Sequence, residues 1–251
     1  MKITVLLILA SISATLNAKP LCISHRGVTT NSIENSLSSI QRAIEVGSEG
    51  VEFDVHHTSD GVALLMHDEN LVRVSQSKEG MECPLYTEVK YLSFERIRTN
   101  CELQNGEEIP TLEETLQVLE SENLYTFLEA KDIPNSKTVA LIEKYNNQKP
   151  EKLRIISFES KALKVFKKLR KKSAFWDDVD LMRVYKFLPI SFSKYGVNIY
   201  FKTRFMAWLP NLFGKEIGVW TVNSDKDLRK VLKRKIHFVT TDEVERCLAL
   251  K

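Results

Sequence analysis

The sequence lacks the features that mark several broad classes of protein. No Pro-, Gly- or Ser-rich linker, low-complexity tract or solenoid-period repeat divides its 251 residues, so neither a domain boundary nor a repeat array is indicated. The formal net charge is only +3, whereas binding to nucleic acid through its backbone usually shows as a strongly basic stripe. We therefore expect one globular domain that does not bind nucleic acid.

Long hydrophobic runs are absent as well. A membrane-spanning helix needs about 20 apolar residues, and the apolar run at residues 3–10 is far shorter. This run follows Lys2 and precedes small and polar residues that end at Ala18, which is the order of a secretory signal peptide. We expect cleavage of residues 1–18 and a mature chain, residues 19–251, that is secreted or periplasmic and has no stable membrane span. An uncleaved anchor is the weaker alternative.

Cysteine is scarce, and no Cys-x-x-Cys spacing suggests zinc or redox chemistry. The four cysteines would lie in an oxidising compartment after export, where disulfides persist. Three pairings are open to four cysteines. Cys83 and Cys101 lie in one loop-like region and could close a short ring, in which case Cys22 and Cys247 would join the first strand to the last helix. Unpaired buried thiols are the alternative.

Beyond the leader, short β-rich apolar runs alternate with segments of helical period. The predicted strands are residues 21–24, 50–55, 124–129, 153–157, 174–176, 197–200, 217–221 and 236–240. Predicted helices include residues 33–46, 111–119 and 160–171. This alternation is typical of βαβ units and a parallel sheet. Eight strands in a chain of this length indicate an α/β fold of the TIM-type (β/α)8 barrel class, which commonly takes about 250 residues as one domain.

One region interrupts the alternation after the second strand. Residues 68–110 carry Gly, Pro, two cysteines and many polar residues before the next helix, which is too long for a plain βα loop. Barrel enzymes build their active sites from loops at the carboxyl ends of the strands. We therefore predict an insertion of about residues 68–110 that forms one wall of the active site.

The second predicted strand carries two acids on one face. Glu52 and Asp54 are two residues apart, so they point the same way, while the residues that alternate with them are apolar. Like charges this close raise one another's pKa unless a cation neutralises them, and oxygen ligands favour a hard ion such as Mg²⁺ or Ca²⁺. Exposed acids on an edge strand are the alternative. The third predicted strand ends in Glu129 and Lys131 with the same spacing, adding an oxygen ligand and a positive charge.

Histidines follow two of the strands. His25 and Arg26 come directly after the first strand, and an arginine fork suits bidentate binding of phosphate. His67 follows another apolar run and would face the same barrel cavity as His25. Two histidines there can share the roles of general base and general acid. The other three histidines have no such arrangement, and we interpret them as surface or packing residues. They are His56, His57 and His237.

The order of these motifs resembles that of the glycerophosphodiester phosphodiesterase family. The amino-terminal matches are His25-Arg26-Gly27, Glu34-Asn35-Ser36, Glu52-Phe53-Asp54-Val55, Thr58-Ser59-Asp60-Gly61 and His67-Asp68. The later matches are Ile109-Pro110-Thr111-Leu112-Glu113-Glu114, Glu129-Ala130-Lys131, Ser157-Phe158, Trp220-Thr221-Val222-Asn223 and Thr241-Asp242. Each motif is short, but so many in one order are hard to obtain by chance, and they span nearly the whole mature chain.

The resemblance implies an enzyme that hydrolyses glycerophosphodiesters to glycerol 3-phosphate and an alcohol with the help of one divalent cation, Ca²⁺ or Mg²⁺. The implied metal ligands are Glu52, Asp54 and Glu129, and the implied acid/base pair is His25 and His67. Substrate would be bound by Arg26, Lys131 and Trp220, with support from Glu34 and Asn35. In the family, the vicinal hydroxyl of the glycerol can attack phosphorus.

Two departures from the family pattern concern specificity. Ser36 stands where Thr is usual, and residues 235–243 lack the common Gly-Val-Asp and Asp-x-Pro features. Neither departure removes an implied ligand or catalytic residue. The nearest alternative is a phospholipase D-like enzyme that acts on intact lysophospholipids or sphingolipids, so a lysophospholipid is the second candidate substrate. The other alternative is a catalytically silent protein that captures phosphodiesters, which the complete set of histidines and acids argues against.

Overall fold

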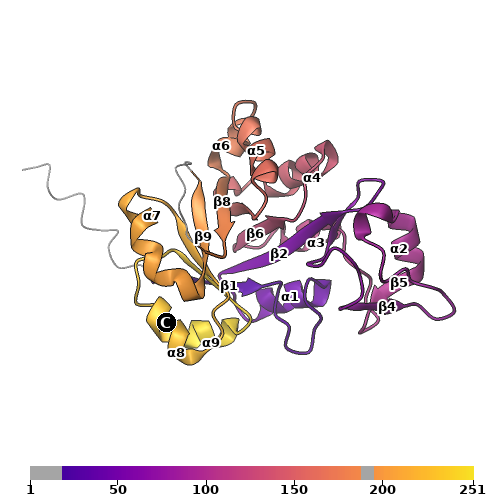
Figure 1. Cartoon of the computed structure of the whole chain (residues 1–251), viewed down its shortest axis with the longest axis horizontal. Coiled ribbons are helices and arrows are strands. Elements are labelled where there is room, and N and C mark those ends of the chain that lie inside the picture. Colours follow the sequence, from indigo (N-terminus) through magenta and orange to yellow (C-terminus); the bar gives the residue numbers. More distant parts are fainter. Residues whose placement is uncertain (1–18, 188–194) are drawn as a thin grey trace, which may run out of the picture.

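The chain folds into a closed parallel barrel surrounded by helices (Figure 1). The computed structural model describes residues 19–187 and 195–251. β1 (Leu21–His25) pairs with both β2 (Gly50–His57) and β11 (Phe238–Thr241), and this double pairing closes the sheet. The predicted (β/α)8 barrel is therefore confirmed. The predicted signal peptide, residues 1–18, lies outside the described residues.

The remaining barrel strands follow in sequence order around the sheet. They are β6 (Tyr125–Ala130), β7 (Leu153–Ser157), β8 (Asp180–Tyr185), β9 (Gly196–Tyr200) and β10 (Ile217–Trp220), each parallel to its neighbours. The outer helices are α1 (Leu37–Glu45), α3 (Leu112–Leu119), α4 (Ser136–Asn146), α5 (Ser160–Leu169), α6 (Ala174–Asp178), α7 (Trp208–Leu212), α8 (Asp225–Val231) and α9 (Val244–Ala249). Short 3₁₀ turns are η2 (Pro150–Lys152) and η3 (Phe201–Ala207). Within the described residues, none of the helices has the length and apolar character required to cross a bilayer.

Two of the predicted elements were placed wrongly. Residues 174–176 form the start of α6 instead of a strand, and the strand β8 begins at Asp180. A short apolar run fits either element, and here the ring of Trp176 packs on Phe166 and Phe175, outside the barrel. The first helix begins at Leu37 rather than residue 33, because the Ser36 side chain caps it by accepting from the Ser39 amide.

The amino end of the barrel interior is filled by an ion pair between aromatic rings. Arg154 donates to both carboxylate oxygens of Glu216 at 2.7 and 2.9 Å. Its guanidinium lies 5.2 Å from the ring centroid of Tyr125 and 5.6 Å from that of Phe238. Because these groups occupy the amino end, the groups available for chemistry lie at the carboxyl ends of the strands, as in other barrels of this type.

The insertion after β2 builds a small lobe of its own. β3 (Ala63–Leu65) pairs antiparallel with β2, and the lobe continues with β4 (Ser75–Ser77), η1 (Val89–Tyr91), α2 (Phe94–Asn100) and β5 (Cys101–Leu103). β4 and β5 form a separate two-stranded sheet. The lobe has a buried cluster, composed of Leu64, Met66, Leu71, Val74, Cys83, Val89, Leu92, Ile97, Cys101, Leu103 and Ile109. Ile33, which precedes the first helix, packs against this cluster.

The two disulfides form one of the three pairings that the sequence left open, the one with a short ring in the insertion. Cys83 bonds to Cys101 across the insertion lobe, and Cys22 on β1 bonds to Cys247 on α9. The first bridge closes a local ring, with a sequence separation of 18 residues, whereas the second spans 225 and ties the two ends of the barrel together. The alternative of free buried thiols is excluded.

Candidate active site

Three buried carboxylates meet at the carboxyl ends of β2 and β6. Glu52, Asp54 and Glu129 each present an oxygen within 4.8 Å of the others, and these residues are only 2%, 1% and 8% exposed. Strand register explains the meeting, because Asp54 and Glu129 are directly paired across the parallel strands. Burial and repulsion from Asp54 raise the pKa of Glu52 to about 8. Oxygen-only ligands at this spacing fit a hard divalent cation.

Two basic side chains balance part of this negative charge. Lys131 Nζ lies 2.9 Å from Asp54 Oδ1 and 2.7 Å from Glu129 Oε1. Arg26 Nε lies 3.2 Å from Asp54 Oδ2. Burial alone would raise the pKa of Asp54, but the charges of Lys131 and Arg26 outweigh it and lower this pKa. The predicted phosphate-binding cations therefore lie directly beside the predicted metal ligands.

The turn after β1 places its backbone against the acids. Arg26 and Gly27 both have positive φ, 57° and 80°, and a Cβ on Gly27 would lie 2.4 Å from Ser39 Oγ. Only glycine avoids both the strain and the clash. The turn directs the Arg26 amide to donate to Glu52 Oε2 at 3.0 Å.

Asn35 holds the central acid in place. Its Nδ2 donates to Asp54 Oδ2 at 2.9 Å, and its Oδ1 accepts from the Asp54 amide at 3.1 Å. Asn35 has a φ of 58° and is 3% exposed. The side chain predicted to support the site thus fixes the orientation of one carboxylate, from the loop just before α1.

His25 is oriented by a residue from the far end of the chain. Its Nδ1 donates to Asp242 Oδ1 at 2.7 Å, which leaves Nε2 free of that bond. Asn223 donates to the other Asp242 oxygen, and its own Oδ1 accepts from the Asp242 amide at 3.0 Å. Burial disfavours the imidazolium, but the Asp242 bond and the charge of Glu52 outweigh it and raise the pKa of His25.

His67 is held in a similar way by its neighbour in sequence. His67 Nδ1 donates to Asp68 Oδ1 at 2.7 Å, and Arg73 donates to Asp68 Oδ2 at 2.6 Å. Arg73 also makes two bonds of 2.7 Å to Glu34, which accepts from Arg26 at 2.8 Å. Burial lowers the pKa of His67, and the charges of Lys131 and Arg26 act in the same direction. A continuous chain of ion pairs thus links this histidine to the turn after β1.

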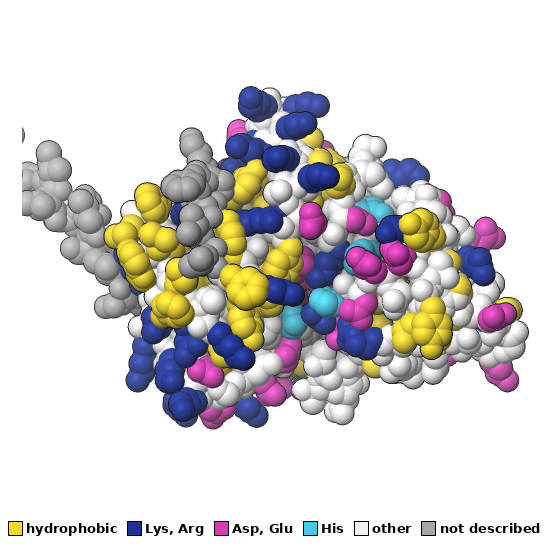
Figure 2. Space-filling view, viewed as in Figure 1, with side chains coloured by type: hydrophobic (Ala, Val, Ile, Leu, Met, Phe, Trp, Pro, Cys, Tyr) yellow, Lys and Arg dark blue, Asp and Glu magenta, His cyan; other side chains and the backbone are white. Residues whose placement is uncertain are grey.

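An aromatic wall lies beside these groups. The Trp220 ring at the end of β10 is 5.5 Å from the ring of Phe158 and 5.5 Å from that of Tyr200. Trp220 is partly exposed, so one part of it is accessible to a ligand. On this face of the molecule, histidines gather with basic and acidic side chains near the middle, between apolar patches (Figure 2).

The other histidines make structural contacts. His57 bonds through Nδ1 to Asp132 and through Nε2 to Thr138 Oγ1, the latter at 2.7 Å. His56 Nε2 lies 3.4 Å from the His67 carbonyl. His237 Nδ1 accepts from the Ile217 amide at 3.0 Å. These contacts pin loops and strand ends around the barrel.

Sequence reasoning missed three residues of the site. Asp242 was noted within a motif but given no role, and its contact with His25 spans 217 residues of sequence. Asn223 was likewise noted within a motif and given no role. Arg73 lies in the insertion and carried no sequence signal, since only the fold brings it to Glu34.

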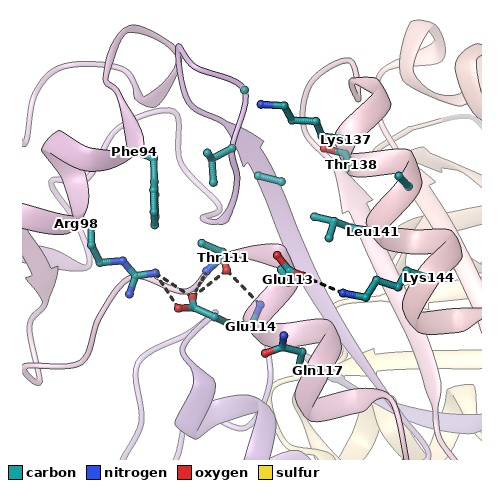
Figure 3. Close-up of a pocket in the computed structure, with 14 residues that line it drawn as sticks. Phe94, Arg98, Thr111, Glu113, Glu114, Gln117, Lys137, Thr138, Leu141 and Lys144 are labelled. Carbon is teal, nitrogen blue, oxygen red and sulfur yellow. Dashed lines mark hydrogen bonds and ion pairs between the residues drawn. The ribbon is translucent and has the colours of Figure 1, made fainter.

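A separate cavity of about 670 Å³ lies between the insertion lobe and helices α3 and α4 (Figure 3). Four of the charged groups in its wall are paired with one another. Arg98 donates to both oxygens of Glu114 at 2.9 and 3.0 Å, and Lys144 donates to Glu113 at 3.3 Å. None of the histidines or buried carboxylates described above lines it, so we locate the chemistry at the barrel mouth.

Comparisons with known proteins agree with this fold and identify a family. The sequence profile described as "Glycerophosphoryl diester phosphodiesterase family" matches residues 25–246. A glycerophosphodiester phosphodiesterase of Caldanaerobacter subterraneus is 27% identical over 92% of this chain and 98% of its own length. Among solved structures, a glycerophosphodiester phosphodiesterase of Parabacteroides distasonis covers 92% of this chain and 96% of its own, with 24% identity and a TM-score of 0.73. An Oleispira antarctica phosphodiesterase in complex with the product sn-glycerol-3-phosphate has 20% identity, the same coverage and a TM-score of 0.73.

Proposed function

The chain belongs to the glycerophosphoryl diester phosphodiesterase family and is an enzyme of that class, and we propose that it hydrolyses glycerophosphodiesters to glycerol 3-phosphate and an alcohol with the help of one divalent cation. One observation carries the proposal. A buried triad of Glu52, Asp54 and Glu129 lies at the barrel mouth, close to two histidines that are each held by an aspartate. The Oleispira relative was solved with sn-glycerol-3-phosphate as its product, which supports the same product here.

Glu52, Asp54 and Glu129 would hold the cation, Ca²⁺ or Mg²⁺. Its donors would all be carboxylate oxygens, which both ions accept. The bound ion would offset negative charge on the phosphoryl oxygens. Asn35 keeps Asp54 in the orientation that this coordination needs.

The two histidines divide the proton transfers. The lowered pKa of His67 favours a neutral imidazole, which suits a base that takes the proton from the attacking hydroxyl. The raised pKa of His25 favours the imidazolium, which suits an acid that protonates the departing alcohol. In both residues the aspartate bond engages Nδ1, so Nε2 would carry the proton transfer. The attacking hydroxyl would be the vicinal hydroxyl of the glycerol, so the alcohol leaves as a 1,2-cyclic glycerol phosphate forms. Water would then open this ring to give glycerol 3-phosphate, with the roles of the two histidines reversed.

Arg26 and Lys131 would bind the phosphate oxygens. Both lie within 3.2 Å of Asp54, so an anionic substrate would share them with the carboxylates. Trp220 would provide an apolar wall for the glycerol or the group next to it. The aromatic rings beside Trp220 also favour a lysophospholipid as a second candidate substrate, because Phe158 and Tyr200 extend the apolar wall.

We further propose export, with cleavage after Ala18 and a secreted or periplasmic location. The leader has the order of a signal peptide. Two disulfides support the proposal, because such bonds persist mainly in oxidising compartments. The amino-terminal sequence of the protein purified from the culture medium or periplasm tests it, and a chain that starts at Met1 in the cytoplasmic fraction would contradict it.

The function is tested by release of glycerol 3-phosphate from a panel of glycerophosphodiesters and lysophospholipids. Chelation should abolish activity, and Ca²⁺ or Mg²⁺ added back singly should restore it. Glu129→Gln should raise the concentration of cation needed for half-maximal activity while the fold is kept. Full activity in chelated, metal-free protein would refute the role of the cation, and binding of the panel without turnover would identify a capture protein instead.

A further inference from the structure

One stretch of the chain has an unusual composition. Residues 181–215 contain no Asp or Glu, whereas six of them are Lys or Arg and nine are aromatic. The stretch covers β8 after its first residue, Asp180, and all of β9, η3 and α7. By contrast, the insertion, taken as residues 67–110, has nine acidic and five basic residues. The two sides of the barrel mouth therefore differ in the sign of their charge.

Large apolar side chains in this stretch are exposed to solvent. Phe205, Trp208, Leu212 and Phe213, which we call the aromatic face, are 64%, 60%, 71% and 68% exposed. They lie on η3, α7 and the residue that follows. A patch of apolar side chains is visible over this part of the molecule in Figure 2. Exposed apolar side chains that cluster in this way mark an interaction surface, whereas single exposed ones are normal.

Ring contacts lead from the wall of the active site to the start of η3, the element on which the aromatic face begins. η3 begins directly after Tyr200, the last residue of β9. The Tyr200 ring lies 5.5 Å from Trp220 in the wall of the site and 5.0 Å from Phe201 at the start of η3. The η3 end of the aromatic face therefore lies beside the barrel mouth.

Basic side chains border the aromatic face. Lys186 and Lys202 are exposed, and their ammonium groups lie 5.6 Å from the Phe158 ring and 5.9 Å from the Tyr200 ring. The helix α8 and the turn after it add a further group of exposed cations, composed of Lys226, Arg229, Lys230, Lys233, Arg234 and Lys235. Basic side chains lie below the apolar patch in Figure 2.

We propose that the aromatic face docks the protein on an anionic lipid surface. Trp and Phe rings favour the boundary between acyl chains and headgroups, and neighbouring Lys and Arg side chains are attracted to anionic lipids. A second copy of the chain would bring two basic surfaces together, and their repulsion disfavours that occupant. The acidic insertion on the other side of the mouth would be repelled by the same lipid surface, which sets the orientation. Docking in this way presents the mouth to phosphodiesters carried by or released from the membrane.

The test measures partition of the chain from Lys19 onward, which contains every barrel strand, onto vesicles. Vesicles of phosphatidylcholine with a third phosphatidylglycerol are compared with vesicles of phosphatidylcholine alone. We expect binding to the anionic vesicles that weakens with added salt, and a blue shift in fluorescence as Trp208 enters the interface. Trp208→Ala with Phe213→Ala should weaken the binding at least tenfold. The matched control is Tyr86→Ala with Tyr91→Ala on the insertion lobe, two aromatics that are 85% and 68% exposed, and it should bind as the wild type does.

Vesicle binding is measured without turnover, so its result does not depend on the proposed reaction. Both double variants should keep the wild-type kcat on a water-soluble glycerophosphodiester, which shows that they are folded. The proposal is overturned if the wild-type chain fails to bind anionic vesicles, or binds neutral ones equally well. It is also overturned if the control variant loses binding as strongly. A concentration-dependent dimer in analytical ultracentrifugation that the Trp208→Ala, Phe213→Ala variant abolishes would assign the aromatic face to a second copy instead.

Discussion

The two histidines of the barrel mouth are held by the same kind of contact, but the contact is built differently at each of them. On the insertion side, His67 is bonded by the adjacent Asp68, and Arg73 of the same lobe fixes that aspartate. His25 lies on β1, the direct neighbour of β2 in the sheet, and is bonded by Asp242, which lies 217 residues away. The insertion side is acidic and has a buried cluster and a disulfide of its own. The β8–β10 side, across the mouth, carries the basic residues 181–215 and the aromatic face.

This difference indicates that the two sides have different tasks. A lobe with its own buried cluster can keep its shape without covering the barrel, so it can position His67 and Arg73 as a rigid wall. The opposite side depends on the barrel for its core and presents its apolar groups outward. We infer that the insertion positions groups for the reaction, and that the β8–β10 side makes contact with an external surface.

The largest effect is expected from the histidines themselves. His25→Ala and His67→Ala should each lower kcat by about 10²–10⁴, the range for losing a positioned acid or base. A nitrophenolate ester of glycerol phosphate, whose leaving group needs no proton, should rescue His25→Ala but not His67→Ala. Circular dichroism and thermal unfolding serve as controls for folding. Equal losses of kcat on good and poor leaving groups in both variants would show that the two histidines do not divide the proton transfers.

The disulfides distinguish the lobe from the barrel. Replacing Cys83 and Cys101 by Ser should cost about 3 kcal/mol, as expected for a short ring, and the loss should be confined to the lobe. Hydrogen exchange should accelerate at the β4 and β5 amides but not at those of β7. The matched variant, Cys22→Ser with Cys247→Ser, should lower the free energy of unfolding of the whole barrel. Faster exchange at β7 in the first variant would show that the lobe is not an independent unit.

A smaller effect is expected from the aspartates that orient the histidines. Asp242→Asn and Asp68→Asn should each lower kcat by about 10- to 100-fold, the range for removing a partner that orients an active-site group. We expect the larger loss for Asp242, because two hydrogen bonds with Asn223 fix both its side chain and its backbone. A shifted pH profile of kcat, with KM unchanged, would separate positioning of the imidazole from a general loss of structure. A greater loss of kcat for Asp68→Asn would contradict the expected order of the two aspartates.

The two local errors in the prediction come from features that hydrophobic periodicity does not show. The run at residues 174–176 is apolar and short, and a strand or a helical turn buries such a run equally well. Its place outside the barrel is decided by the rings of Phe166 and Phe175, which pack against Trp176. The start of the first helix was misplaced by four residues, because a polar loop with Asn35 at positive φ precedes the cap. Neither effect is visible in hydrophobic periodicity alone.

The sequence by itself determined the barrel and its acidic triad. Alternating strands and helices specify the layers, and the two-residue spacing of Glu52 and Asp54 puts both on the inward face whatever the details of packing. Only the tertiary structure decided which partners orient these groups. Asp242 reaches His25, and Arg73 reaches Glu34, because closing the barrel and folding the insertion bring distant segments together. Spacing along the chain fixes which side chains share a face, but distances between segments are set by the packing of the whole core.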